Sequence, residues 1–117
     1  MWIRVTLGLA AMLISGVAQA KDLRGADYYL PKCKSIFEHR EQVDVAAGAC
    51  LGIITALTDL SPFFETPFKF CPPPQLDPAT AMLMVVQYIE QKASQKLKEP
   101  FIGLAIEALQ ETFPCKK

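Results

Sequence analysis

Apolar residues recur with the spacing of an amphipathic helix over residues 43–60, the clearest periodic stretch of the chain. They fall at i, i+3, i+4 and i+7, which places them on one helix face. These residues are Val43, Ala46, Ala47, Cys50, Ile53, Ile54 and Leu57. Gly48 and Gly52 lie in the same stretch, four residues apart. Glycine costs a helix about 1 kcal/mol relative to alanine, so we expect a neighbouring helix to approach closely there.

A second strong helical segment covers residues 77–93. Asp77 followed by Pro78 is a typical start, because aspartate caps the first turn and proline fits the first helical position. Apolar residues occupy nearly the whole circumference of this helix, and such a helix is either the centre of a bundle or part of a subunit interface. Both interpretations remain open.

Two further helices are predicted at the ends of the domain, over residues 22–39 and 94–113. In the first, Pro31 must lie in the first turn or break the helix. Its candidate N-caps are two aspartates, Asp22 and Asp27. In the second, Pro100 either kinks the helix or marks a restart capped by Glu99. Four helices with antiparallel neighbours predict an all-α fold, a small irregular four-helix bundle.

Residues 61–76 form a loop between the second and third predicted helices. They contain five of the nine prolines and four of the seven phenylalanines, so neither a helix nor a regular strand is expected. Its phenylalanines either fold back as a lid over the helices or project, with neighbouring charges, as a stiff partner-binding surface. The candidate partner-binding residues are Phe63, Phe64, Glu65, Phe68 and Lys69.

The first twenty residues have the layout of a cleavable signal peptide. Arg4 precedes an apolar run, and Ala18–Ala20 has the A-x-A pattern of a cleavage site. We expect cleavage after Ala20, export of the mature chain, and a single domain over residues 21–117. Lys/Arg and Asp/Glu are balanced at twelve each over the full chain. That balance predicts no nucleic-acid partner and no membrane association after cleavage.

Four cysteines, all beyond the signal peptide, predict two disulfides in an exported domain. They are Cys33, Cys50, Cys71 and Cys115. The helix layout favours Cys33–Cys50 and Cys71–Cys115, because each pair lies roughly symmetrically about a helix–helix turn. The alternative, Cys33–Cys115 with Cys50–Cys71, stays open. The spacings lack the close ligand pairs of a zinc site.

The sequence contains no recognisable catalytic centre. Catalysis by a nucleophile requires a base within hydrogen-bond reach, and the only histidine, His39, lies in a polar turn where a solvated role is expected. Standard hydrolase, nucleotide-binding and metalloprotease motifs are absent. We therefore expect a binding protein without cofactor or metal rather than an enzyme.

The cysteines and their neighbours resemble those of the Rap/Tai immunity proteins of type VI secretion systems. The matching segments are Cys33, Cys50–Ile54, Phe70–Pro72, Val85–Val86, Tyr88–Ile89, Ala108–Leu109 and Phe113–Cys115. Two positions depart from the family pattern: Ala56 stands where a glycine is expected, and Ala93–Ser94 where a His-Pro pair is expected. The matching residues are structural, so no effector-contacting residue is transferred.

The resemblance implies a periplasmic, helical, disulfide-bonded protein that binds a peptidoglycan-amidase effector and covers its active-site cleft. It also implies a homodimer, which would suit the interface interpretation of helix 77–93. Alternatives from other classes are a periplasmic stress chaperone, which would expose its apolar helix at low pH, and an envelope scaffold. The identity of the partner does not follow from the residues.

Overall fold

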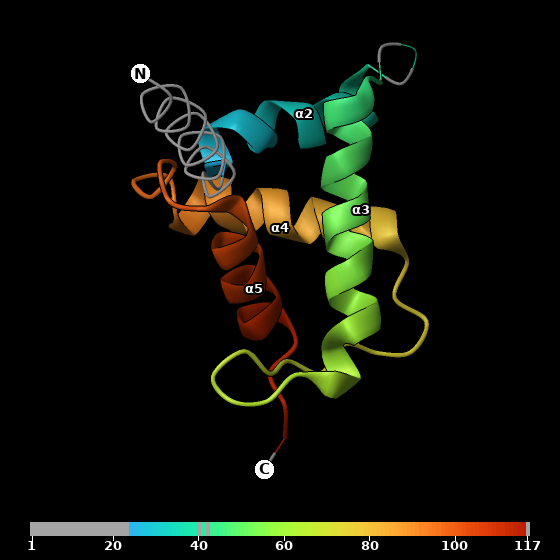
Figure 1. Ribbon diagram of the computed structural model, residues 1–117, viewed down its shortest axis with the longest axis vertical. Helices are drawn as coiled ribbons and strands as arrows, with labels where there is room; N and C mark the ends of the chain where they lie inside the picture. Colours follow the sequence, from blue (N-terminus) through green and yellow to red (C-terminus); the bar gives the residue numbers. More distant parts are fainter. Residues whose placement is uncertain (1–23, 40, 42, 117) are drawn as a thin grey trace, which may run out of the picture.

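The structure is a computed structural model that describes residues 24–39, 41 and 43–116. Its helices, labelled as in Figure 1, are α2 (Ala26–Glu38), α3 (Val45–Leu60), α4 (Pro78–Lys92) and α5 (Phe101–Thr112), with a short 3-10 turn, η3 (Ser61–Phe63). The predicted all-α, irregular four-helix fold is confirmed for this part of the chain. The predicted signal peptide and the candidate cap Asp22 lie outside the described residues.

α4 lies at the centre of the bundle. It contacts each of the other three helices. Its buried side chains are those of Ala81, Met82, Val85, Val86 and Ile89. Of the two interpretations of this segment, the structure shows central packing. The N-terminus of α4 is the one predicted, with Pro78 in the first turn and the Asp77 carboxylate accepting a hydrogen bond from the Thr80 N–H at 3.1 Å.

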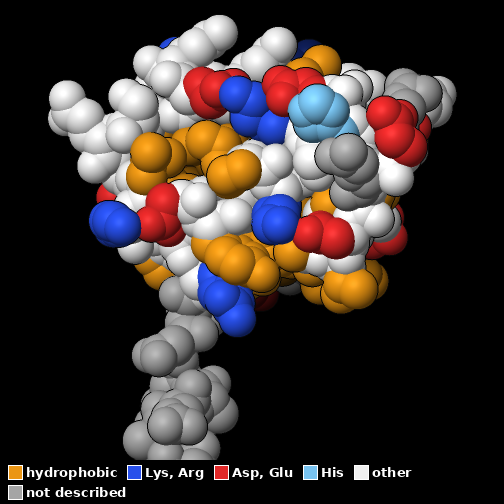
Figure 2. Space-filling model, turned by 90° about the horizontal axis from the view of Figure 1, so that it is seen from above, with side chains coloured by type: hydrophobic (Ala, Val, Ile, Leu, Met, Phe, Trp, Pro, Cys, Tyr) orange, Lys and Arg blue, Asp and Glu red, His pale blue; other side chains and the backbone are white. Residues whose placement is uncertain are grey.

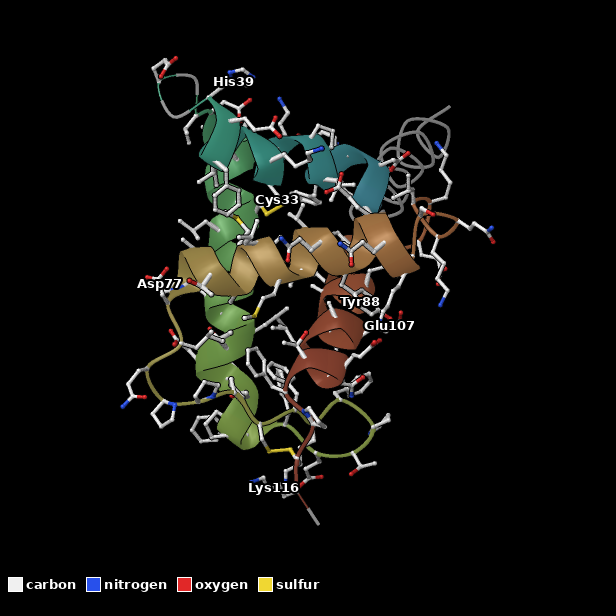
Figure 3. All side chains as sticks on the ribbon, turned by 180° about the vertical axis from the view of Figure 1, so that it is seen from behind. Cys33, His39, Asp77, Tyr88, Glu107 and Lys116 are labelled. Carbon is white, nitrogen blue, oxygen red and sulfur yellow. A yellow bond between two sulfur atoms is a disulfide. The ribbon has the colours of Figure 1, made fainter. Side chains whose placement is uncertain are left out.

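The helices cross one another instead of running antiparallel side by side as predicted. In Figures 1 and 3, α2 and α4 run across the upright pair α3 and α5. Antiparallel packing is typical of helices joined by short links. Here the link from α3 to α4 spans residues 61–77, and it leaves α4 free to cross α3.

The last helix is shorter than the predicted segment 94–113. α5 begins at Phe101, and residues 94–100 form turns. Its N-cap is Pro100, so the assignment of Glu99 as cap was wrong. Proline disfavours helical geometry in the residue before it, which explains why the chain restarts its helix after Pro100.

The turns at 94–100 complete the N-terminus of α2. No side chain caps this helix, and its N-cap is Gly25, not Asp27. Free N–H groups of its first turn instead donate to carbonyl oxygens of the turns, Ala26 to Glu99 at 3.1 Å and Asp27 to Leu97 at 2.8 Å. Backbone groups thus replace the expected carboxylate cap.

Pro31 lies inside α2, so the expectation that it would occupy the first turn or break the helix was wrong. Proline has no N–H, and it therefore leaves the carbonyl of Asp27, four residues earlier, without its helical donor. Tertiary contacts hold the helix on both sides of this point. The turns at 94–100 bind its N-terminal end, and a disulfide at Cys33 ties its middle to α3.

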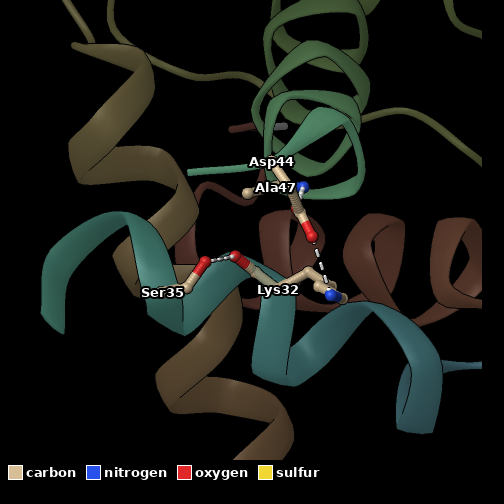
Figure 4. Close-up of polar contacts among 4 residues, drawn as sticks. All are labelled: Lys32, Ser35, Asp44 and Ala47. Carbon is tan, nitrogen blue, oxygen red and sulfur yellow. Dashed lines mark hydrogen bonds and ion pairs between the residues drawn. The ribbon is translucent and has the colours of Figure 1, made fainter. Parts of the chain in front are cut away.

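α3 begins at Val45, two residues later than predicted, because Asp44 caps it. The Asp44 carboxylate accepts a hydrogen bond from the Ala47 N–H at 2.9 Å, and its other oxygen accepts one from the Lys32 ammonium of α2 at 2.8 Å (Figure 4). One aspartate therefore both starts α3 and links it to α2. The sequence signal for this cap is an aspartate near the start of the periodic stretch, three residues before the Ala47 N–H that it accepts from.

Two disulfides cross-link the fold, one in the core and one at the end that holds the loop 61–76. Cys33–Cys50 joins α2 to α3 with a Cα–Cα distance of 5.5 Å, and Cys71–Cys115 joins the loop to the segment after α5 with a Cα–Cα distance of 4.9 Å (Figure 3). This is the pairing that the helix layout favours, and the alternative pairing does not occur. Both cysteines of the first pair are fully buried in the core.

Candidate partner-binding site

Residues of the loop 61–76 itself anchor the loop to the helix bundle, through side-chain packing and a backbone hydrogen bond. It lies at the end of the molecule where α3 ends and the C-terminus emerges (Figure 1). Phe70 is only 1% exposed and belongs to the core, and the ring of Phe64 lies 5.9 Å from it, centroid to centroid. The N–H of Cys71 donates to the Phe113 carbonyl oxygen at 2.8 Å. These contacts hold the C-terminal half of the loop against α5.

The tip of the loop is also bound to α5. The side-chain amide of Gln110 donates to the carbonyl oxygen of Pro67 and, at 3.4 Å, to that of Lys69. The backbone N–H of Phe68 donates to the Glu65 carbonyl oxygen at 2.8 Å, which closes a turn within the loop. The loop is therefore held in one conformation at its tip as well as at its base.

The phenylalanines of the loop divide between the two interpretations. Phe64 is half-buried and Phe70 buried, as expected for a lid. Phe63 and Phe68 are 78% and 57% exposed, as expected for a partner-binding surface. The charged candidates Glu65 and Lys69 are also exposed. Four of the five candidate residues are thus exposed, and the fifth, Phe64, is partly buried against Phe70.

Beside these residues the surface is hollowed. A groove of about 330 Å³ lies between the end of α3 and the triple proline. Its lining residues are Thr58, Asp59, Ser61, Pro62, Pro72, Pro73, Pro74 and Leu76. A smaller pocket of about 220 Å³ adjoins it and shares Ser61, Pro62 and Pro72. A protein partner would meet proline rings and a single carboxylate here, which favours apolar contact over ion pairing.

The ion pairs of the described residues lie away from this loop. Four of them are Lys32–Asp44, Lys34–Glu90, Lys92–Glu111 and Lys98–Asp27, each between two segments distant in sequence. A hydrogen bond from Lys98 lowers the pKa of Asp27, and hydrogen bonds from Lys32 and from the Ala47 N–H lower the pKa of Asp44. Both carboxylates are at the surface, so their contribution to stability is modest.

The described residues do not assemble a catalytic or metal site. His39 is exposed at the end of α2 and forms the pale blue patch in Figure 2. All four cysteines are in disulfides, and no group of three or more His, Cys, Asp or Glu side chains comes together in the described part of the chain. What the arrangement offers chemically is a surface for binding, formed by exposed aromatic rings on an anchored loop.

The outer face of α3 is a second exposed apolar surface, and it was not recognised from the sequence. Val45 is 91% and Leu60 49% exposed at its two ends. Between them lie Gly48, Gly52 and Ala56, all exposed. The expected close approach of a neighbouring helix at the glycines was wrong for this chain, because a Cβ added at Gly48 or Gly52 would meet nothing within 4 Å.

α3 and the turn after it are also unusually apolar along their whole length. Val45–Phe63 is the stretch of the described residues that is long and apolar enough to cross a membrane, by length and composition only. A core helix of a soluble protein passes the same test. The four-residue spacing of Gly48, Gly52 and Ala56, opposite the buried Cys50 and Ile54, is the sequence signal that identifies the exposed face.

The chain was compared with known proteins. The family model of the Rap1a immunity proteins matches residues 24–115. This match covers all four helices and all four cysteines. No curated protein and no solved structure matched the chain. Because the family match spans most of the chain and coincides with the described fold, the protein belongs to the Rap1a immunity protein family.

Proposed function

We propose that the protein is exported to the periplasm, where it binds a peptidoglycan-amidase effector of a type VI secretion system and blocks its cleft. It acts by binding, not by catalysis. Family membership supports an immunity role and a protein partner. The two disulfides fit an oxidising compartment. The sequence pattern of residues 1–20 supports export by a cleaved signal peptide.

The observation that carries the proposal is the exposure of Phe63 and Phe68 on a loop that is otherwise anchored. Large exposed aromatic side chains are the usual centres of binding energy in protein interfaces. The loop is held by Gln110 and by the buried ring of Phe70, so little conformational entropy is lost when it binds. A rigid projecting loop of this kind fits a concave enzyme cleft better than a flat surface.

The charges of the loop suggest how it is oriented. Glu65 and Lys69 are exposed near the two phenylalanines, and neither takes part in an ion pair within the described residues. Both are free to meet opposite charges of the effector at the rim of the interface. Rim charges of this type affect the association rate and its salt dependence more than the affinity.

The proposal predicts an amidase gene next to that of this protein, and the test is a binding and inhibition assay with its product. Mature protein and amidase are mixed, the affinity is measured by calorimetry, and hydrolysis of purified peptidoglycan is followed. We expect a complex that buries on the order of 800 Å² per partner and full inhibition at equimolar ratio. Absence of binding to this and to related amidases would contradict the proposal.

Two single variants locate the interface. Phe63→Ala and Phe68→Ala should each weaken the complex by about 2 kcal/mol or more if the rings are central to the interface. The matched control is Leu83→Ala on α4, where an apolar side chain is 40% exposed but belongs to a different surface. Weakening by the control but not by the loop variants would place the interface elsewhere.

We propose that the homodimer implied by the family resemblance forms through α3 rather than α4. α4 buries five apolar residues within the chain and leaves Leu83 exposed, whereas the outer face of α3 from Val45 to Leu60 is exposed along its length and lacks any basic residue. Its pattern is self-complementary about a two-fold axis at Gly52. An antiparallel second copy would place small residues opposite small ones, Gly48 against Ala56, and Val45 against Asp59.

The charges at the ends of α3 also bear on this arrangement. Asp59 is the only charged residue of the exposed stripe and lies near the C-terminal end of α3. In the antiparallel pair it would face the N-terminal end of the partner's α3, whose helix dipole favours a negative charge. The same helix end also carries the Asp44 carboxylate, which caps the partner's α3 and is paired with Lys32, so Asp59 would add a second carboxylate there.

Light scattering after size exclusion tests the dimer. Wild type is expected at twice the monomer mass. Gly52→Arg should yield a folded monomer, because a side chain at this position meets nothing within the chain. Gly103→Arg on α5, equally unobstructed, should leave the dimer intact. A monomeric wild type, or a dimeric Gly52→Arg variant, would rule out this interface.

A further inference from the structure

The two disulfides differ sharply in accessibility. Cys33 and Cys50 are both 0% exposed and lie among core side chains of α2 and α3. Cys71 is exposed and Cys115 partly exposed, in the loop and in the segment after α5. Thiol–disulfide exchange requires a thiolate to reach a disulfide sulfur in line, so access decides which bond reacts.

The surroundings of the exposed disulfide favour exchange. Cys71 lines the 220 Å³ surface pocket together with Lys69, so an attacking group has room to approach. Lys116 follows Cys115 directly, and Figure 3 shows it beside the disulfide at the lower end of the molecule. Lys69 and Lys116 are therefore basic residues of the same surface region, and an ammonium group that approaches a sulfur there would stabilise a leaving thiolate. Cys33 also has lysines on both sides, Lys32 and Lys34, but these form ion pairs with Asp44 and Glu90. The sulfurs of the buried pair are moreover enclosed by the core.

We propose that Cys71–Cys115 is a site of thiol–disulfide exchange for an external dithiol, such as a dithiol oxidoreductase, and that its redox state controls the partner-binding loop. One thiolate of the dithiol attacks a sulfur of the Cys71–Cys115 bond, forms a mixed disulfide and releases the other cysteine as a thiolate. The second thiol of the reagent then displaces the protein cysteine. The dithiol ends as a disulfide, and Cys71 and Cys115 end as two thiols after uptake of two protons.

Reduction of this bond would loosen the loop 61–76. It is the covalent link between the loop and the segment after α5, and it is adjacent to the hydrogen bond from Cys71 to Phe113. After reduction the remaining anchors of the loop are all non-covalent: the ring of Phe70, the hydrogen bonds of Gln110 and the hydrogen bond from Cys71 to Phe113. Phe63 and Phe68 would then be less ordered before binding, and ordering them would oppose association. This step rests on the proposed function of the loop.

The chemical part is tested on the oxidised, mature protein alone. Samples are treated with dithiothreitol for increasing times under native conditions, quenched with iodoacetamide, digested and mapped by mass spectrometry. We expect Cys71 and Cys115 to be alkylated at least about tenfold faster than Cys33 and Cys50, because only the first pair is accessible. Equal rates, or earlier labelling of the buried pair, would overturn the proposal.

The regulatory part uses the amidase. The double variant Cys71→Ser/Cys115→Ser represents the reduced state, and circular dichroism verifies that its helix content is retained. We expect faster amide exchange over residues 63–70 and an affinity reduced by about tenfold or more. If this variant loses its fold, protein reduced only at Cys71 and Cys115 is measured in its place.

The two proposals fail in different ways. If oxidised wild type does not bind the amidase, the proposed function is wrong, whereas the alkylation rates are unaffected. If oxidised protein binds and the reduced or double-serine protein binds equally well, the loop is not under redox control, and the inference is wrong although the proposed function stands.

Discussion

The side-chain amide of Gln110 on α5 is bonded to the backbone carbonyl of Pro67 at the tip of the loop 61–76, 43 residues away in sequence. This contact joins the last helix to the surface that carries Phe68. It is independent of the disulfide at the base of the loop, so the loop is fixed at two separate points. The conformation of the partner-binding surface therefore depends on a residue that lies outside the loop.

Gln110→Ala should loosen the loop with little effect on the helices. Loss of one side-chain hydrogen bond typically lowers the free energy of unfolding by about 1 kcal/mol. We expect that decrease in chemical denaturation and faster amide exchange at residues 66–69. Gln91→Ala, at an exposed position of α4, is the matched control and should leave both unchanged. Equal behaviour of the two variants would show that the contact does not order the loop.

Gly25→Ala should destabilise the protein. A Cβ at this position would lie 2.6 Å from Asp27 Oδ1 and 3.1 Å and 3.2 Å from the backbone carbonyl oxygens of Leu97 and Lys98. Because backbone atoms cannot easily move away, we expect a loss of about 1–3 kcal/mol in the free energy of unfolding, measured by urea denaturation.

The control for Gly25 is Gly103→Ala on α5. A Cβ there meets nothing within 4 Å, so the higher helix propensity of alanine should stabilise the protein by up to about 1 kcal/mol. The free energy of unfolding is therefore expected to fall for Gly25→Ala and to rise for Gly103→Ala. Destabilisation of similar size at both positions would mean that the contact between α2 and the turns at 94–100 does not explain the glycine.

Met82→Ala and Leu83→Ala, neighbours on α4, should differ strongly. Met82 is 0% exposed in the centre of the bundle, whereas Leu83 is 40% exposed. Truncation of a buried methionine typically costs 2–5 kcal/mol, roughly, because a cavity remains, while a surface change stays within about 0.5 kcal/mol. Thermal and urea denaturation measure both. Similar losses would indicate that Leu83 is covered in solution and would return α4 to consideration as a subunit interface.

Stability should fall at acid pH partly through Asp27 and Asp44. The pKa of each is lowered below the ordinary value of 3.8, chiefly by a hydrogen bond from Lys98 and from Lys32 respectively. A carboxyl group with a lower pKa in the folded state stabilises the protein fully above its unfolded pKa, and this stabilisation is lost as pH falls through the folded pKa. The loss is therefore expected below about pH 4.

The lysines that pair with these aspartates predict that the stability of the protein also falls at alkaline pH. The pKa values of Lys32 and Lys98 are raised above 10.5 by the same hydrogen bonds. Their stabilisation is present below the unfolded pKa and is lost as pH rises through the folded one.

The acid limit is tested with the double variant Asp27→Asn/Asp44→Asn. It should flatten the acid limb of a plot of melting temperature against pH, because neither asparagine titrates, while asparagine at position 44 retains the cap of α3. An unchanged acid limb would assign the effect to other groups.

Several features of this protein follow from its sequence because they are decided by neighbouring residues. Asp77–Pro78 starts α4 through a side chain that reaches three residues ahead and a fixed backbone angle. The apolar spacing of residues 45–60 determines which face of α3 turns inward. With the helices placed, the distances along the chain favour the disulfides Cys33–Cys50 and Cys71–Cys115.

Other features were decided only by the tertiary structure, since they depend on contacts between distant segments. Pro31 is tolerated within α2 because the turns at 94–100 bind the helix end. Phe64 faces inward and Phe63 outward, although they are adjacent, because Phe70 in the core packs against only one of them. Gly48 and Gly52 are exposed because α2 and α4 cover the opposite face of α3. These features cannot be predicted from neighbouring residues alone, because the burial of a side chain depends on which surfaces the folded chain brings together.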